Sequence, residues 1–326
     1  MKNRKWWKGA QLLSRNMSSG TSFKGDPFHL FTARGTGYDL YEPNSTSNRT
    51  LLLVYGMTLA GEKEIRLVHF ARVLASSGFQ VIVPCLPGLK GYTFDLFDLE
   101  RLADLIASVG KEKNGHLGIV GFSAGGSMSL VVASRAELTD LIDVLLLFSP
   151  FSSLPDAWEN VRFKALAEPI EDAEWDHFIW CTCVLAYIQR NQLHFQGREQ
   201  AELEDLLRNY CTGISAEEKR AFYNKVLRNR DINSDVLKDL APQVWDGFSP
   251  RGKLASLKGR VMILHDPHDP WAPPWHSEEI MVELQQRGKP NAQKCLVSPL
   301  ISHVTPRYLF RLNDIFYVID MISELY

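Results

Sequence analysis

The amino-acid sequence predicts an α/β fold with a mostly parallel central sheet, helices on both faces of that sheet and an inserted helical cap. Strand and helix patterns alternate along the chain, which is typical of parallel sheets covered by helices. The run Leu51–Tyr55 is continuously apolar, as expected for a strand buried on both faces. Between Phe151 and Gly259, roughly a hundred residues carry a helical pattern without a strand signal, far beyond the usual length of a connection.

The strands of the predicted sheet are short apolar runs bounded by turn residues. In chain order they are Phe28–Ala33, Tyr38–Tyr41, Leu51–Tyr55, Phe79–Val83, Leu117–Val120, Asp143–Phe148, Arg260–His265 and Lys294–Val297. Gly35 and Gly37 separate the first two strands, which indicates an antiparallel hairpin at one edge of the sheet.

The helices of the predicted core alternate with these strands, and the first of them carries Ile65, Val68 and Leu74 on one apolar stripe. They are Glu62–Ser77, Asp95–Val109, a helix rich in small residues that follows Gly121-Phe-Ser-Ala-Gly-Gly126 and extends to about Ser134, Ser277–Arg287 and Arg307–Glu324. In the cap, Glu174–Arg190 has a helical pattern, and Ser215-Ala-Glu-Glu218 is a capping box that opens a second helix.

These patterns divide the chain into a leader, a core and a cap. Residues 1–26 form a basic N-terminal leader, residues 27–151 and 251–326 form the α/β core, and residues 152–250 form the helical cap. We expect a poorly ordered leader, as most first residues are. Its lysines and arginines stand beside Trp6 and Trp7, so weak peripheral membrane contact through residues 1–20 is a secondary expectation. No signal peptide or transmembrane segment is predicted.

Composition excludes several classes of partner. A net charge of -2 argues against nucleic acid as a partner, because phosphate binding needs a concentrated positive surface. The five cysteines are scattered and odd in number, which favours reduced thiols and a cytoplasmic location over a disulfide framework. Cys181 and Cys183 lack a second cysteine pair, so no zinc site is expected there. The sequence leaves the oligomeric state open.

The segment Gly121-Phe-Ser123-Ala-Gly125 matches the pattern G-x-S-x-G and lies between a buried strand and a helix. The chain must turn sharply there, and glycines two residues before and two after the serine keep the turn free of side-chain clashes. Such a turn exposes the serine hydroxyl. Ser123 is therefore the candidate nucleophile.

Candidates for the other two catalytic groups follow later in the chain. A serine hydroxyl is a poor nucleophile at neutral pH and needs a base, which in turn needs an orienting carboxylate. An acidic loop follows Arg260–His265, and in it Asp269 is the preferred acid and Asp266 the alternative. His303 lies between the last strand and the last helix, so it faces the same end of the sheet as the serine. The sequence thus predicts a Ser-Asp-His triad.

Two other groups of residues suggest binding sites less strongly. The histidines around the acidic loop (His265, His268 and His276) match no zinc-ligand spacing, so no metal is expected. The cap is rich in aromatic residues that are candidates for an apolar substrate surface, although most are expected to form the core of the cap itself. They are Trp158, Trp175, Phe178, Trp180, Tyr187, Phe222 and Tyr223.

With this motif and this order of residues, the sequence resembles the α/β-hydrolase superfamily over roughly residues 28 to 326. The resemblance implies the α/β-hydrolase fold, with Ser123 as nucleophile, Asp269 as acid and His303 as base. It also implies an oxyanion hole made by two backbone N–H groups, those of Met57 and Ala124. The chain departs from the family pattern before Met57, where Tyr55-Gly56 replaces the usual His-Gly.

The resemblance implies a serine hydrolase that forms an acyl-enzyme and requires no cofactor. Carboxylic esters with an apolar acyl group or alcohol are the first substrate class, while thioesters, amides and lactones stay open because the same triad serves them all. The alternative is a non-catalytic protein of this fold that binds an apolar small molecule or a protein partner under the cap. An intact triad argues against that alternative.

Overall fold

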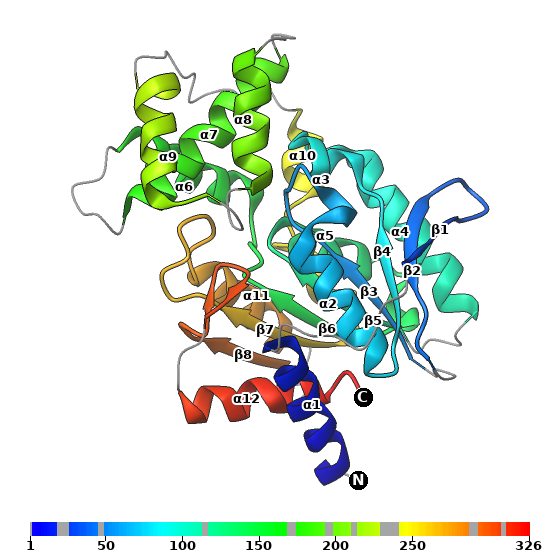
Figure 1. Ribbon diagram of the computed structural model, residues 1–326. Helices are drawn as coiled ribbons and strands as arrows, with labels where there is room; N and C mark the ends of the chain where they lie inside the picture. The colour runs from blue at the N-terminus through cyan, green and yellow to red at the C-terminus, as the bar shows by residue number, and fades with distance from the viewer. Residues whose placement is uncertain are drawn as a thin grey trace.

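A sheet of eight strands forms the centre of the protein, as seen in a computed structural model (Figure 1). The structure describes residues 2–17, 26–44, 49–112, 117–167, 174–192, 198–209, 214–228, 241–286, 293–307 and 311–326. The strands of this sheet are β1 (Phe28–Phe31), β2 (Gly37–Tyr41), β3 (Thr50–Val54), β4 (Gln80–Pro84), β5 (Leu117–Phe122), β6 (Ile142–Phe148), β7 (Arg260–His265) and β8 (Gln293–Val297). Each strand predicted from the sequence is confirmed to within a few residues.

The order of the strands in the sheet is β1-β2-β4-β3-β5-β6-β7-β8. The predicted hairpin is confirmed at one edge, where β1 pairs antiparallel with β2 and β2 pairs antiparallel with β4. All pairs from β4 to β8 are parallel. Strands β3 and β5 are neighbours, so the residues that follow their carboxyl ends lie close together.

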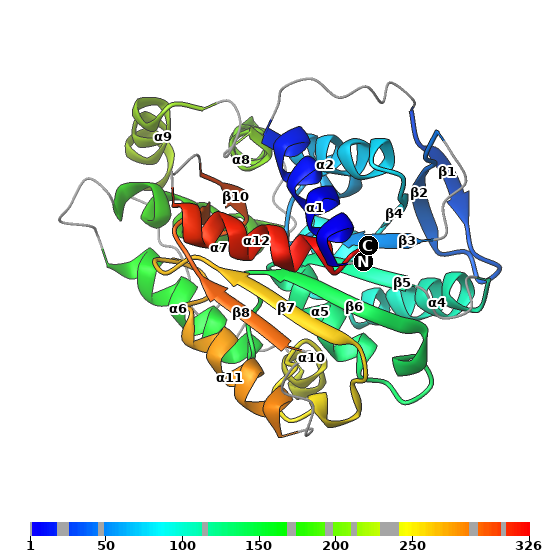
Figure 2. The same ribbon diagram turned by 90° about the horizontal axis from the view of Figure 1, so that it is seen from below.

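Helices cover both faces of the sheet (Figure 2). One face carries α1 (Lys2–Met17), α2 (Ile65–Ser76) and α12 (Leu312–Ser323), and the other carries α4 (Leu96–Glu112), α5 (Ala124–Ala133) and α11 (Trp275–Gln285). Shorter helical turns are α3 (Pro87–Gly91), η1 (Gly61–Lys63), η2 (Thr139–Leu141) and η5 (Leu254–Ser256). The predicted end of one core helix, Arg287, lies outside the described residues. The last helix was predicted to start at Arg307, which the structure describes outside any helix, and α12 starts at Leu312.

The helices between β6 and β7 stand beyond one end of the sheet, at the top of Figure 1. They are α6 (Leu154–Leu166), α7 (Trp175–Gln192), α8 (Arg198–Asn209), α9 (Ala216–Phe222) with a π-helical turn over Tyr223–Leu227, and α10 (Pro242–Gly247). The capping box is confirmed at Ser215, whose hydroxyl accepts from the Glu218 N–H while the Glu218 carboxylate accepts from the Ser215 N–H. The division into core and cap stays a prediction.

The N-terminal segment differs from the expected poorly ordered leader, because its described part is a helix packed on the core. In α1, Leu12 is 1% exposed, and Gly9 lies so close to α12 that an added Cβ would be 2.7 Å from the Ile319 carbonyl oxygen. The Arg15 guanidinium donates to the Ser76 carbonyl at the end of α2. The sequence prediction failed because an apolar stripe of a few residues gains its stability only from a partner surface.

Candidate active site

Ser123 lies in the turn between β5 and α5 with strained backbone geometry. Its φ of 50° and ψ of −124° belong to a region that residues other than glycine rarely occupy. The Ser123 N–H donates to the Phe148 carbonyl at 2.8 Å, and the Ser123 carbonyl accepts from the Gly126 N–H at 2.9 Å. Hydrogen bonds to β6 and α5 thus hold the serine in a conformation that the isolated turn would not adopt.

The glycines around Ser123 are required by close contacts with the backbone. A Cβ on Gly125 would lie 2.1 Å from the Tyr55 carbonyl oxygen, and a Cβ on Gly121 would lie 2.7 Å from the Gly126 Cα. From the other side, a Cβ on Gly56 would lie 3.1 Å from the Ser123 Cβ. The turn after β3 therefore lies directly against the serine, which brings the candidate oxyanion loop to it.

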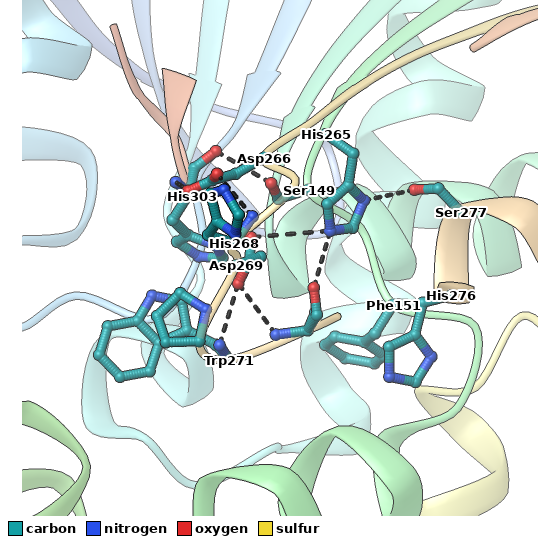
Figure 3. Close-up of polar contacts among 12 residues, drawn as sticks. Ser149, Phe151, His265, Asp266, His268, Asp269, Trp271, His276, Ser277 and His303 are labelled. Atoms are coloured by element: carbon teal, nitrogen blue, oxygen red, sulfur yellow. Dashed lines mark hydrogen bonds and ion pairs between the residues drawn. The ribbon is translucent and has the colours of Figure 1, made fainter. Parts of the chain in front are cut away.

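Asp269 is fully buried in the loop after β7, and its two carboxylate oxygens have different partners (Figure 3). Oδ1 accepts from the N–H groups of Trp271 and Ala272 at 2.9 and 3.0 Å. Oδ2 lies 2.6 Å from Nδ1 of His303. Burial by itself raises the pKa of this carboxyl group, but the nearby His303 and these hydrogen bonds outweigh burial and lower it. Asp269 is therefore an anion held against the imidazole.

Asp266, the alternative acid, contacts the same histidine at its backbone. Its Oδ2 accepts from the His303 N–H at 2.9 Å, and its Oδ1 accepts from the His268 N–H at 2.9 Å. The two aspartates thus divide their contacts, since Asp269 contacts the ring of His303 and Asp266 contacts its main chain.

His303 lies between two short strands, β9 (Ile301–Ser302) and β10 (Thr305–Pro306), which pair antiparallel. Its φ is 53°, and its carbonyl accepts from the Ser149 hydroxyl at 2.9 Å. Arg66 at the start of α2 donates to the Thr305 hydroxyl at 2.7 Å. Ser149 and Asp266 therefore bind the backbone of this histidine directly, and Arg66 binds the short strand that follows it.

The contact with Asp269 also determines which nitrogen of His303 can act as a base. A carboxylate only accepts, so Nδ1 carries a proton and Nε2 has a free lone pair when the ring is neutral. Among the residues that the structure describes, no hydrogen bond joins the Ser123 hydroxyl to His303. The structure thus brings Asp269 and His303, the candidate acid and base, into contact, while the serine is held separately by its own turn.

His265 supports the acid loop from inside the core. Its Nε2 lies 2.7 Å from the Ala272 carbonyl oxygen, and its Nδ1 lies 2.5 Å from the Ser277 hydroxyl. A carbonyl can only accept, so the proton is on Nε2. Burial is the main reason that the pKa of His265 is lowered, which keeps the ring neutral. In the described part of the chain, no group of three or more His, Cys, Asp or Glu side chains is arranged to hold a metal ion.

Aromatic residues connect helix α7 to the acid loop at Trp271. The Trp271 ring lies edge-on to His303 with 6.0 Å between the ring centroids, and Trp180 of α7 lies 3.7 Å from Trp271 by the same measure. His177, one turn earlier in α7, lies 5.9 Å from Trp271. Trp271 and His177 are not among the candidate site residues predicted from the sequence. The available signal was the position of Trp271, two residues after the candidate acid.

Other aromatic residues of segment 152–250 pack among its helices or are buried. Trp175, Phe178 and Tyr223 pack against one another with ring centroids 5.1 to 5.8 Å apart. Trp158 and Tyr187 are buried as well. Trp180 differs from these residues because it faces the acid loop.

The candidate oxyanion residues follow the carboxyl ends of two neighbouring strands. Ala124 is the first residue of α5, so its N–H has no acceptor within the helix. Met57 follows Tyr55 and Gly56 at the end of β3. The Tyr55 hydroxyl donates to the Leu86 carbonyl at 3.2 Å and accepts from the Leu86 N–H at 2.8 Å. The tyrosine that replaces the usual histidine thus ties the loop after β3 to the end of β4.

A sequence model of the Alpha/beta hydrolase family matches residues 64–294, which is more than half of the chain. The chain belongs to the alpha/beta hydrolase family. A search of curated protein sequences finds no match to this hydrolase. No helix in the described ranges is long and apolar enough to span a membrane.

Solved structures of several enzymes share the fold of this alpha/beta hydrolase. The esterase RhEst1 from Rhodococcus sp. ECU1013 is 16% identical with a TM-score of 0.50, over 93% of this chain and 100% of the esterase. DcsB, solved with its substrate analogue, is 14% identical with a TM-score of 0.53, over 92% of this chain and 99% of DcsB. At these identities the similarity shows the fold alone.

A further similar structure is the acylaminoacyl peptidase from Pyrococcus horikoshii, which is 13% identical with a TM-score of 0.51. The alignment covers 91% of this chain and 44% of that peptidase. The chain therefore spans less than half the length of the acylaminoacyl peptidases that it matches.

Proposed function

We propose that this chain is a serine hydrolase that cleaves a carboxylic ester through an acyl-enzyme on Ser123. The observation that carries the proposal is the buried carboxylate of Asp269, 2.6 Å from Nδ1 of His303. A buried carboxylate that accepts from one imidazole nitrogen leaves the lone pair of the other nitrogen free to take a proton. It also stabilises the imidazolium that then forms. The strained turn at Ser123 further supports the proposal, because it holds a serine at the carboxyl end of the neighbouring strands.

In the proposed reaction, the Ser123 oxygen attacks the ester carbonyl while its proton moves to Nε2 of His303. The carbonyl oxygen becomes an oxyanion that accepts from the N–H groups of Met57 and Ala124. The C–O bond to the alcohol then breaks, and the alcohol leaves with the proton from Nε2. Water, deprotonated by the same nitrogen, attacks the acyl-enzyme and releases the acid and Ser123.

We propose Asp269 as the acid of the triad, and Asp266 as the residue that positions the main chain of His303. An acid in a triad must contact the ring nitrogen opposite the one that acts as base. Asp269 meets this requirement, whereas Asp266 accepts from the backbone N–H of His303.

The substrate is proposed to carry an apolar group that lies under the helices of residues 152–250. Trp180 and Trp271 form an aromatic contact between α7 and the acid loop, next to His303. Apolar surface so close to the proposed base favours an apolar acyl group or alcohol. Similar structures include an esterase and a peptidase, so amides and thioesters belong in the same substrate screen.

We also propose a cytoplasmic location. The four cysteines in the described residues, Cys85, Cys181, Cys183 and Cys295, are free thiols, as a reducing compartment favours. Cys211 lies outside the described residues.

A second candidate is a non-catalytic protein of this fold that binds an apolar small molecule under the cap. The observation that favours it is the lack of a hydrogen bond between Ser123 and His303 within the described part of the chain. Proton transfer needs these groups about 2.6 to 3.2 Å apart, although the distance in a ligand-free enzyme is often longer.

Labelling with a fluorophosphonate probe separates the two candidates. Wild type, Ser123→Ala and the control Ser127→Ala are incubated with the probe, and adducts are counted by intact mass. Ser127 is buried and donates to the Phe151 carbonyl, so it has no proposed role in the reaction. One adduct on wild type and on Ser127→Ala, with none on Ser123→Ala, would support the hydrolase. A folded wild type without any adduct would favour the binding protein.

A further inference from the structure

Helix α1 presents a fixed outward face because its inner face is docked on the core. Leu12 is buried, Gly9 contacts the main chain of α12, and Arg15 binds the end of α2. Arg4 and Trp7 are exposed and stand one helical turn apart on the side turned away from the core. Lys8 is exposed as well, and its ammonium lies 4.9 Å from the centroid of the Tyr326 ring. Docking therefore leaves a tryptophan and an arginine together on the surface.

Aromatic side chains continue this surface from α1 onto α12. Trp7 is 64% exposed, and its ring lies 5.4 Å from that of Trp6, which lies 6.0 Å from that of Phe316. Phe316 and Leu312 are 50% and 51% exposed and stand one helical turn apart. We call Trp6, Trp7, Leu312 and Phe316 the α1/α12 patch. Adjoining exposed apolar side chains of this kind mark an interaction site.

The charge of helix α1 is positive. Helix α1 contains no acidic residue, and Arg4 and Lys5 form no ion pair within the described residues. The acidic residues of α12 already have partners: Asp314 pairs with Arg311 and accepts from the Ser298 hydroxyl, and Asp320 pairs with Lys294. The patch therefore combines exposed aromatic rings with cations that no acid of α1 neutralises.

We propose that the α1/α12 patch docks this protein on the surface of an anionic lipid bilayer. Tryptophan rings favour the headgroup level of a membrane, where their apolar part is buried and their N–H stays hydrated. Lysine and arginine beside them bind anionic headgroups. A few cations on a chain of net charge -2 do not form a nucleic-acid surface, and phosphate backbones offer no place for Trp7 and Phe316 to be buried.

Docking through this patch leaves the proposed active site accessible. Helices α1 and α12 lie at the opposite end of the molecule from α6 to α9 (Figure 1). The bilayer would therefore contact α1 and α12, and helices α6 to α9 would face away from the bilayer. This surface is independent of the proposed hydrolase activity, so either proposal can fail alone.

Vesicle co-sedimentation of the full chain tests the proposal. Wild type is expected to sediment with vesicles of phosphatidylcholine and phosphatidylglycerol, and to bind vesicles of phosphatidylcholine alone much more weakly. Trp7→Ala should reduce binding to anionic vesicles about tenfold, because it removes a large side chain that the bilayer would bury. Replacing Arg4 and Lys8 by glutamine should reduce binding about fivefold for each cation, and added salt should weaken wild-type binding.

The matched control is Phe97→Ala on α4, since Phe97 is 69% exposed and lies outside the patch. It should bind as wild type does, and equal melting temperatures would show that all variants are folded. No binding to anionic vesicles, or equal losses in Trp7→Ala and Phe97→Ala, would overturn the proposal. Two further results would overturn it. In one, duplex DNA fully displaces both wild type and Trp7→Ala from anionic vesicles. In the other, the protein is a dimer in solution and Trp7→Ala dissociates that dimer.

Discussion

At the scale of single residues, the loop after β7 assigns different tasks to two aspartates three positions apart. Asp269 is buried, accepts two backbone N–H groups and contacts the ring of His303, whereas Asp266 holds the main chain of His303. The first arrangement sets the proton position on the imidazole and the second sets the place of the histidine. Asparagine at each position separates these tasks, because it keeps the size of the side chain and removes the charge.

Asp269→Asn is expected to lower kcat by about 10⁴-fold with little change in fold, because the amide stabilises neither the imidazolium nor the required tautomer. Asp266→Asn should lower kcat much less and lower the melting temperature instead. Both kcat and melting temperature are measured for each variant on an ester found in the substrate screen. The opposite pattern, with the larger loss of kcat in Asp266→Asn, would exchange the two roles.

His276 is a buried histidine with no part in the proposed reaction. Its Nδ1 donates to the Ser152 hydroxyl oxygen at 2.9 Å, because that hydroxyl donates its own proton to the Glu279 carboxylate. Its Nε2 is buried with no hydrogen-bond partner among the described residues. Burial is the main cause that lowers the pKa of His276 from 6.5 to about 4. The folded protein therefore holds this ring neutral at a pH where the unfolded chain protonates it.

The free energy of unfolding is expected to fall as the pH drops from 6.5 to about 4, where the unfolded chain binds a proton that folded His276 does not. The contribution of this group is fully present above pH 6.5, and its loss amounts to about 3 kcal/mol. Urea titrations between pH 7 and 4 measure the effect. His276→Gln should flatten the dependence, while His268→Gln, at an exposed position, should not. An unchanged slope in His276→Gln would contradict this assignment.

At the scale of secondary-structure elements, the turn between β5 and α5 depends on contact with β3. Gly125 lies against the carbonyl oxygens of Tyr55 and Val54, with no space for a side chain. Gly126, the next residue, has more space. A Cβ added there would lie 3.3 Å from its nearest neighbour, the Gly121 carbonyl oxygen. The neighbouring glycines thus form a matched pair for testing the turn.

Gly125→Ala is expected to destabilise the protein by about 4 kcal/mol or more, because the added methyl group must displace backbone of β3. Gly126→Ala should change stability by less than about 1 kcal/mol, since the mild crowding is offset by the better helix propensity of alanine. Thermal melting of both variants provides the measurement. Equal melting temperatures would mean that the turn does not pack against β3 as described.

Helix α7 has two aromatic sides, one inside the helical segment 152–250 and one on the acid loop. Trp180→Ala removes the contact with Trp271, and we expect it to lower kcat/KM for esters with bulky apolar groups by about tenfold or more. For acetate esters the change should be small. Trp175→Ala, on the inner side, should lower the melting temperature and leave this preference unchanged. Equal losses on bulky and small esters in Trp180→Ala would argue against a substrate surface there.

At the scale of the whole molecule, the two ends of the chain complete one face of the sheet. Helix α1 crosses α12, and the Tyr326 ring lies 4.7 Å from that of Phe79, between ring centroids. Arg49, just before β3, donates to the Leu325 carbonyl at 3.0 Å. The N-terminal helix is thus part of the folded core, and its loss would uncover apolar surface of α12.

Leu12→Ala is expected to lower the free energy of unfolding by about 2 to 5 kcal/mol, as for other buried leucines. Gln11→Ala, on the exposed side of the same helix, should have almost no effect. Chemical denaturation of the two variants provides the comparison. A Leu12→Ala variant as stable as wild type would show that α1 does not contribute to the core.

The sequence by itself determined the strands, most core helices and the class of the fold. Strands buried on both faces must be apolar throughout, as in Leu51–Tyr55, and a strand-to-helix turn must carry glycines around Ser123. These requirements are local, so they can be recognised in a few neighbouring residues. The glycine motif selected Ser123 as a candidate. The positions of the acidic loop and of His303 after predicted strands selected them as candidates too.

Only the tertiary structure decided which residues of these segments meet. The sequence preferred Asp269 over Asp266 but left both open, and the path of the loop gives Asp269 the ring of His303 and Asp266 its main chain. The docking of α1 and the contact of Trp180 with Trp271 arose in the same way. Each depends on a surface supplied by a distant part of the chain, and no local periodicity encodes such a contact.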